Sequence, residues 1–160
     1  TRYLTAVYSA DGSRMHEIPT IQDHIAPKTT SDLLFKGAVS DNARSVYSGL
    51  IRVGKEARGT NAYQTNRNLV LSEGAGAESV PNLEIETNDV VCSHASAVGP
   101  IDDEQRYYLE SRGIPPEVAE RLIVLGFFGE VLDRLPASEA IAGLRATLVR
   151  RLAQRAGEAT

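Results

Sequence analysis

The spacing of apolar residues along this 160-residue chain changes once, near Gly99. Before that point apolar and polar residues alternate in short runs, and this alternation predicts half-buried β-strands. Residues 82–87 are the clearest case. There Leu83 and Ile85 are expected to point inward, while the glutamates that follow each of them face water.

Further strands are expected around apolar positions that recur at short intervals, without a helix-length pattern between them. Turn signals rich in Gly, Asn, Asp and Ser separate them, for example in 54–61 and 72–82. Such a series is typical of a sandwich, a barrel or a β-solenoid. Irregular turns and small strand residues favour a solenoid, whose rungs stack closely, although periodicity alone leaves a sandwich open. The expected strand positions are Leu34, Leu50, Leu69, Leu83 and Val91, in addition to 3–9.

After Gly99 the apolar period becomes helical. The segment 100–113 predicts a first helix, with Asp102, Asp103 and Glu104 in its first turn, where negative charge favours the positive end of the helix dipole. Gly113 is expected at the position that follows the helix end.

Two more helices are expected beyond this one. The segment 114–136 begins with proline in its first turn and stops before Pro136, and Ser138 is a suitable N-cap for the last helix. The sequence therefore predicts strand-built rungs over 1–99 and a small helical subdomain over 100–160. The expected apolar stripes are Val118, Leu122, Leu125, Phe128 and Leu132 on the second helix, and Ile141, Leu144, Leu148 and Leu152 on the third.

Composition and charge narrow the function classes. The formal net charge of −4 argues against nucleic-acid binding, which needs a basic surface, and the arginines of 148–155 are expected to form a solvated helix face. A single cysteine fits a reducing compartment. No apolar run approaches the ~20 residues of a membrane span and no signal peptide is visible, so we expect a cytoplasmic protein. The chain opens at Thr1 without a methionine, which is compatible with a piece of a longer protein.

Cys92 and His94 form the most suggestive pair of chemical groups. In an extended strand, side chains two residues apart emerge on one face, roughly 6.5–7 Å apart at the backbone. Thiolate and imidazole suit zinc, iron or an iron–sulfur cluster. Two donors do not complete a site, however, and His16 and His24 lie far back in the sequence. Any remaining ligands would come most simply from a partner chain. The alternative is a small buried thiol beside a surface histidine.

Two other function classes stay open on the residues alone. A β-helical hydrolase would need converging carboxylates, for which Asp32, Asp41 and Asp89 are the candidates. A generic β-solenoid interaction module without a metal role fits the composition equally well. The adjacent carboxylates 102–104 are better explained by helix capping than by acid–base chemistry.

A family resemblance adds to this reading. The blocks "VPNLEI", "CSH", "GPIDDEQ" and "YYLESRGI" occur in this order, within a stretch that starts near His24 and ends near Leu135. This stretch resembles the carboxyl-terminal part of the SufB/SufD family, the scaffold subunits of the Suf iron–sulfur cluster assembly machinery.

The resemblance implies a right-handed parallel β-helix, here without its amino-terminal part, followed by a helical subdomain. It also implies two partners. The helical subdomain would dock on SufC, an ABC-type ATPase, with charged residues around Glu117–Arg134 as candidate contacts. The β-helix edge would pair with the sister scaffold SufB. This chain would be a non-catalytic subunit, and ATP hydrolysis would belong to SufC.

Two departures from the SufB pattern place the chain closest to SufD. The strand segment 66–71 holds no cysteine, and Ala95 follows His94 where SufB has a glutamate. His94 matches the SufD histidine implicated in cluster assembly at the SufB–SufD interface, and Cys92 belongs to the same motif as a second candidate ligand. No tightly bound cofactor is expected in the isolated chain, only a transient iron–sulfur cluster in the full complex. An open β-helix edge also predicts a homodimer of the isolated chain.

Overall fold

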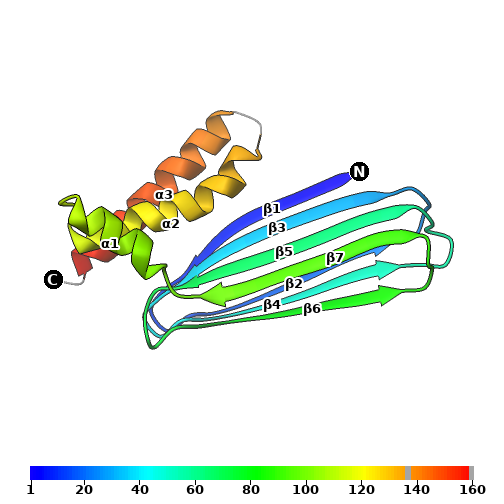
Figure 1. Cartoon of the computed structure of the whole chain (residues 1–160), viewed down its shortest axis with the longest axis horizontal. Coiled ribbons are helices and arrows are strands. Elements are labelled where there is room, and N and C mark those ends of the chain that lie inside the picture. Colours follow the sequence, from blue (N-terminus) through cyan, green and yellow to red (C-terminus); the bar gives the residue numbers. More distant parts are fainter. Residues whose placement is uncertain (136–137, 159–160) are drawn as a thin grey trace. The chain divides into compact units, whose positions relative to one another are not determined.

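A computed structural model describes residues 1–135 and 138–158 of the chain. The chain forms two compact units, Thr1–Pro100 and Ile101–Thr160. The first unit holds strands and the second holds helices (Figure 1).

The first unit is a parallel β-solenoid of about three turns, which confirms the fold predicted from the sequence. Two parallel sheets run along it, one in the order β1-β3-β5-β7 and the other in the order β2-β4-β6, so that the chain alternates between them (Figure 1). The strands are β1 Arg2–Ala10, β2 Met15–His24, β3 Thr30–Val39, β4 Arg44–Val53, β5 Thr60–Val70, β6 Gly76–Ile85 and β7 Val90–Gly99.

One rung of the solenoid comprises one strand in each sheet, and strands pair with the second strand along the chain. Ser31 of β3 is thus in register with Ala62 of β5, and Ala62 is in register with Cys92 of β7. The turn predicted for 72–82 is shorter than expected, because strand β6 already begins at Gly76. β2 is not among the strands expected from the sequence. It contains Pro19, which an edge strand tolerates because its outer side needs no ladder hydrogen bond.

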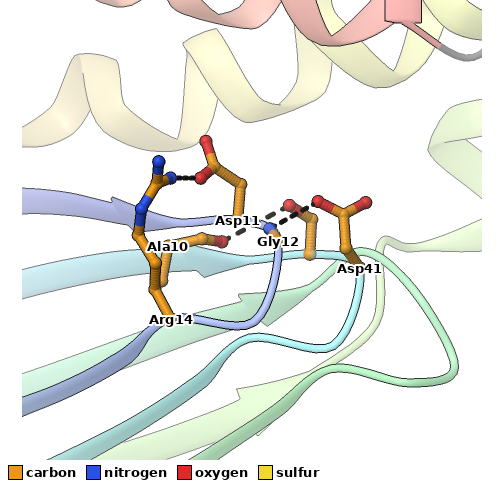
Figure 2. Close-up of polar contacts among 6 residues, drawn as sticks. Ala10, Asp11, Gly12, Arg14 and Asp41 are labelled. Atoms are coloured by element: carbon orange, nitrogen blue, oxygen red, sulfur yellow. Dashed lines mark hydrogen bonds and ion pairs between the residues drawn. The ribbon is translucent and has the colours of Figure 1, made fainter.

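The corners of successive rungs are joined by hydrogen bonds between side chains and backbone. The Gly12 amide donates to Oδ2 of Asp41 at 2.8 Å (Figure 2). The Asp41 amide donates in turn to Oγ of Ser72 at 2.9 Å, so that three consecutive corners are linked. Asp41 has a φ of 56°, a left-handed conformation that aspartate tolerates better than most residues. An ion pair between Arg14 and Asp11 lies on the surface of the first of these corners.

The interior of the solenoid is apolar near both rows of corners, where the strands begin and end, and in part of the space between them. Phe35 and Tyr47 face each other with ring centroids 5.7 Å apart, and the Tyr47 hydroxyl lies 2.8 Å from Oγ1 of Thr20. Successive side chains of a strand point to opposite faces, which explains the alternating burial along β4 and β5, and the parallel register keeps the same face inward from strand to strand. The buried clusters are Ala10, Val39, Ala43 and Ala75; Ile51, Val53, Ala57 and Ala62; and Leu33, Phe35 and Tyr47.

The inward orientation predicted for Leu83 and Ile85 is confirmed by the ladder, because they are in register with the buried Ile51 and Val53. Both remain about two-fifths exposed, at 39% and 41%. The reason is that β6 is the last strand of its sheet, so no further rung covers them.

The described residues of the second unit form three helices, as predicted: α1 Asp103–Ser111, α2 Pro116–Asp133 and α3 Glu139–Glu158. Asp102 caps α1, since its Oδ1 accepts from the Glu104 amide at 2.9 Å, and Gly113 follows the helix with a φ of 83°. Ser138 caps α3 through a 3.3 Å bond from the Ile141 amide. These three capping assignments are therefore confirmed.

The face that α2 buries differs from the predicted stripe. Ala119, Val124 and Val131 are buried together with Phe128 and Leu132, whereas Leu122 is 45% exposed. The centre of this helix is apolar on nearly every side, so its spacing does not select one face. On α3, Leu148 and Leu152 are buried as expected, but Leu144 is exposed. The predicted stop at Pro136 falls outside the described residues.

Within the described part of the chain, none of the helices combines the length and the apolar character that a membrane span requires.

The corner hydrogen bonds give a first testable expectation. Asp41→Ala removes the acceptor of the Gly12 amide and puts alanine in a left-handed conformation, so we expect the free energy of unfolding to fall by about 1–2 kcal/mol. Chemical denaturation followed by circular dichroism measures it. Asp11→Ala is the control, because its exposed ion pair should contribute less than about 0.5 kcal/mol. Equal effects of the two substitutions would contradict this account of the corners.

Candidate functional site

Cys92 and His94 lie on β7, the edge strand of the four-stranded sheet. Cys92 is in register with Ala62 and His94 with Gln64, and both of these β5 residues are buried in the interior. Residues paired in a parallel ladder point to the same side. The structure therefore places Cys92 and His94 on one face of the strand, the face that continues the solenoid interior.

The two side chains have different surroundings. Cys92 is partly buried and packs with Val90 against the cluster of Ile51, Val53, Ala57 and Ala62. Burial raises the pKa of the Cys92 thiol, and a hydrogen bond with the Ala62 backbone opposes this only in part. A thiol of this kind stays protonated and behaves as a small apolar side chain.

His94 is exposed, although it continues the interior face. This combination arises because β7 is the last rung, so no strand lies beyond it in this chain. The imidazole is consequently available at the open end of the solenoid.

The strand that carries His94 is also the one with the least protected edge. Its sequence, "VVCSHASAVG", contains no charged residue and no proline, and Val91 and Val98 are exposed. The other three edge strands contain charged residues, and both edge strands of the three-stranded sheet contain a proline as well. Charges and prolines are the usual means of blocking strand addition. β7 lacks them and is suited to pairing with another chain.

The remaining histidines are not brought to this pair. His16 and His24 lie on β2, in the first rung and in the other sheet. His24 is buried, with Nδ1 2.6 Å from Oγ1 of Thr29 and Nε2 2.8 Å from Oγ of Ser31. Burial lowers the pKa of His24, and the Asp23 carboxylate opposes this. Across the described residues no group of three or more His, Cys, Asp or Glu side chains is placed to hold a metal ion.

The three aspartates considered for hydrolysis do not converge. Asp32 stands near the start of β3 and Asp41 just beyond its end, and nine residues of extended chain span about 30 Å. Asp89 precedes β7, and Asp41 is engaged by the Gly12 amide. The arrangement offers no carboxylate pair for acid–base chemistry among them.

A row of buried amide side chains on β5 is the part of the site that sequence reasoning missed. Gln64, Asn66 and Asn68 alternate along the inward face and are at most 3% exposed. The Tyr8 hydroxyl donates to Oδ1 of Asn68, and Nδ2 of Asn68 donates to Oδ1 of Asn66 at 2.8 Å. Burial raises the pKa of Tyr8, which keeps its hydroxyl a donor. The strand period alone could have placed these amides inside.

The helical unit has a surface groove of its own. It lies between α1 and α2, has a volume of about 490 Å³, and is lined by Tyr108, Leu109, Leu122 and Ile123, with Asp102, Glu104 and Gln105 beside them. Arg112 lies over the Tyr108 ring, 5.0 Å from its centroid. Exposed aromatic and aliphatic groups next to carboxylates make this groove a candidate binding surface.

Comparison with known proteins adds a family to these observations. The model of a family described as "SUF system FeS cluster assembly, SufBD core domain" matches residues 2–127. An iron–sulfur cluster assembly SufBD family protein of Mycobacterium bovis is 43% identical over 153 residues, which cover 91% of this chain and 38% of the relative.

Proteins named iron–sulfur cluster assembly protein SufD are similar as well. The Escherichia coli protein is 41% identical over 122 residues, covering 76% of this chain and 28% of the relative. The Bacillus subtilis protein is 38% identical over 138 residues, covering 86% and 31%. The chain thus spans about a third of the length of these relatives.

The surroundings of Cys92 predict that its thiol reacts slowly with alkylating reagents near neutral pH. Because burial raises its pKa above the ordinary value of 9.0, the alkylation rate with iodoacetamide should still rise steeply with pH at pH 9. The matched control is the double variant Cys92→Ala, Ser93→Cys, which places the thiol at an exposed position one residue further on. An alkylation rate for Cys92 that levels off below pH 8.5 would contradict the assignment of Cys92 to packing.

Proposed function

Since this chain belongs to the SufBD family of iron–sulfur cluster assembly proteins, we propose that it acts as a SufD-type scaffold subunit, contributing His94 to cluster assembly at a subunit interface. The observation that carries the proposal is the position of His94: an exposed imidazole on an uncharged edge strand with no further rung beyond it.

Pairing with a SufB-type scaffold through the β7 edge follows from the backbone chemistry of that strand. Each β-strand presents N–H and C=O groups to both sides, and β7 has a strand of this chain on one side only. A strand from a partner would complete its hydrogen bonds and would cover Val91 and Val98. The partner's edge would thereby come close to His94.

At such an interface His94 would supply a neutral imidazole, as a donor to iron or as a proton acceptor for the nascent cluster. The cluster is transient cargo of the complex. Cys92, with its raised pKa and its apolar contacts, supports the interface through packing. The missing thiolate and carboxylate ligands come from the partner.

The helical unit is the proposed docking site for the ATPase SufC. Its groove offers Tyr108 and Leu122 as apolar anchors, and tyrosine is among the residues that contribute most to binding energy at interfaces. Asp102 and Glu104 favour a partner surface with basic residues around an apolar side chain. In this scheme ATP hydrolysis belongs to SufC, and the hydrogen-bonded rungs of the solenoid transmit its movement as a rigid body.

Removal of the imidazole tests the central role. His94→Ala changes an exposed side chain, so folding and SufC binding should stay at wild-type levels while cluster formation with SufB and SufC falls at least tenfold. Anaerobic reconstitution with iron and sulfide, followed by visible absorption, measures it. If the complex with His94→Ala forms clusters at the wild-type level, this role of His94 is refuted. The chain would then be better described as a β-solenoid interaction module without a metal role.

A charge at the middle of β7 tests the pairing edge. Ala95→Lys leaves the fold intact because Ala95 is exposed, yet a lysine on an edge strand opposes strand addition, so SufB affinity should drop at least tenfold. The isolated chain should also change from a concentration-dependent dimer to a monomer in sedimentation velocity. Thr65→Lys, at the register partner of Ala95 on the inner strand β5, is the control. A wild-type chain that sediments as a monomer at every concentration contradicts the homodimer.

The docking groove is tested with Tyr108→Ala. Loss of an anchor side chain should weaken SufC binding about tenfold or more, corresponding to at least ~1.4 kcal/mol, while the helical circular dichroism stays unchanged. Tyr63→Ala is the control, since Tyr63 is an exposed tyrosine on the solenoid. If the two variants bind SufC with equal affinity by calorimetry, the groove is not the docking site.

A further inference from the structure

Gln64 occupies the interior position next to His94. The two residues are register partners on the adjacent strands β5 and β7, and parallel partners project to the same side, with strands about 4.8 Å apart. The contacts of Cys92 with the interior cluster establish independently that this face of β7 is the inward one. Gln64 is therefore the buried polar residue at the register position next to His94.

The carboxamide of Gln64 is buried and fixed in position. Gln64 is 2% exposed, and its amide end lies against Gly49 of β4, where even a Cβ on that glycine would overlap it. Glycine at position 49 thus makes room for the carboxamide. A group packed in this way on a regular strand has little freedom to change its position.

The Oε1 atom of Gln64 is an acceptor that no described residue uses. The neighbouring amide oxygens on β5 are engaged: Oδ1 of Asn68 accepts from Tyr8, and Oδ1 of Asn66 accepts from Asn68. The Nδ2 donor of Asn66 is buried without a partner among the described residues. The other buried acceptors without a partner belong to Gln22, Ser45 and Ser79, which lie on β2, β4 and β6 of the other sheet. The strand next to β7 is β5. Among the described residues of β5, Oε1 of Gln64 is the buried acceptor without a hydrogen-bond partner.

We propose that Gln64 is the positioning residue for His94, accepting a hydrogen bond from one ring N–H through Oε1. An imidazole that binds a metal through one nitrogen usually donates its other N–H to a fixed acceptor, which selects the tautomer and the ring orientation. Gln64 supplies that acceptor from within this chain, so the free nitrogen of His94 is directed toward the interface. The role given to this hydrogen bond rests on the proposed function of His94. The existence of the bond can be tested independently of that function.

The test is ¹⁵N NMR of the histidine rings in the 160-residue chain, without metal or partner. In the wild type, the ring nitrogen shifts of His94 should show one dominant tautomer, identified by the loss of that signal in His94→Ala. Gln64→Leu removes the acceptor while keeping the apolar part of the side chain, and should give the tautomer mixture of a solvated imidazole. His24, held by Thr29 and Ser31, serves as an internal reference.

Two further variants make the result specific. Asn68→Leu is the matched control, since it removes a buried amide from the same face of β5, in register with Val98, and should leave the His94 shifts unchanged. Gly49→Ala keeps Gln64 but occupies the space of its carboxamide, and should reproduce the effect of Gln64→Leu. It also preserves the test if Gln64→Leu fails to fold.

The outcomes separate this inference from the proposed function. Cluster formation in the complex should fall severalfold in Gln64→Leu, because the ring is present but not fixed. A His94 tautomer ratio that is the same in wild type and both variants overturns the role of Gln64, even if His94→Ala abolishes cluster formation. Conversely, the His94 tautomer ratio could shift in Gln64→Leu and Gly49→Ala while His94→Ala still forms clusters at the wild-type level. That result supports the hydrogen bond and refutes the proposed function.

Discussion

In a parallel solenoid, the backbone N–H and C=O groups of a strand form their hydrogen bonds with strands of the neighbouring rungs. This constraint shapes the whole of the first unit. Each strand depends on the strands before and after it in its own sheet for its hydrogen bonds, as the unbroken registers from β1 to β7 and from β2 to β6 demonstrate. The corners repeat the same dependence, since Asp41 accepts from one rung and donates to the next. A structure built in this way leaves one side of each outermost strand unpaired, and β7 is one of these strands.

Two unlike residues lie on this edge strand, and they differ in what packs beneath them. Cys92 lies where the apolar cluster of the preceding rungs extends beneath it, so its thiol is desolvated and protonated. His94, two residues further, continues the same face and is exposed, with Gln64 as its register partner on β5. The pair thus combines a packed thiol with an exposed imidazole. Its incomplete ligand set is what a site shared between two chains would show.

Much of the fold could be predicted because its determinants are local. Alternation in 82–87 placed Leu83 and Ile85 on the inward face, and Asp102, Gly113 and Ser138 marked helix ends through short-range capping chemistry.

Features that depend on distant partners could not be predicted in the same way. β2 is polar and holds a proline, so only its pairing with β4 reveals it as a strand. α2 is apolar on nearly all sides, so tertiary packing selects its buried face. The likeness of the "CSH" block to a family pointed to His94. The strand period could have placed Gln64 inside, but its pairing with His94 depends on a register that joins residues in different rungs.

The most direct test of the account is hydrogen–deuterium exchange along β7 in the presence and absence of a SufB-type scaffold. If the edge is completed by a partner strand, the amides of Val90–Gly99 should become protected on complex formation, whereas the inner strand β5, already paired on both sides, should change little. Exchange in β7 that stays unchanged while another surface becomes protected would contradict the claim that His94 meets its partner at this edge.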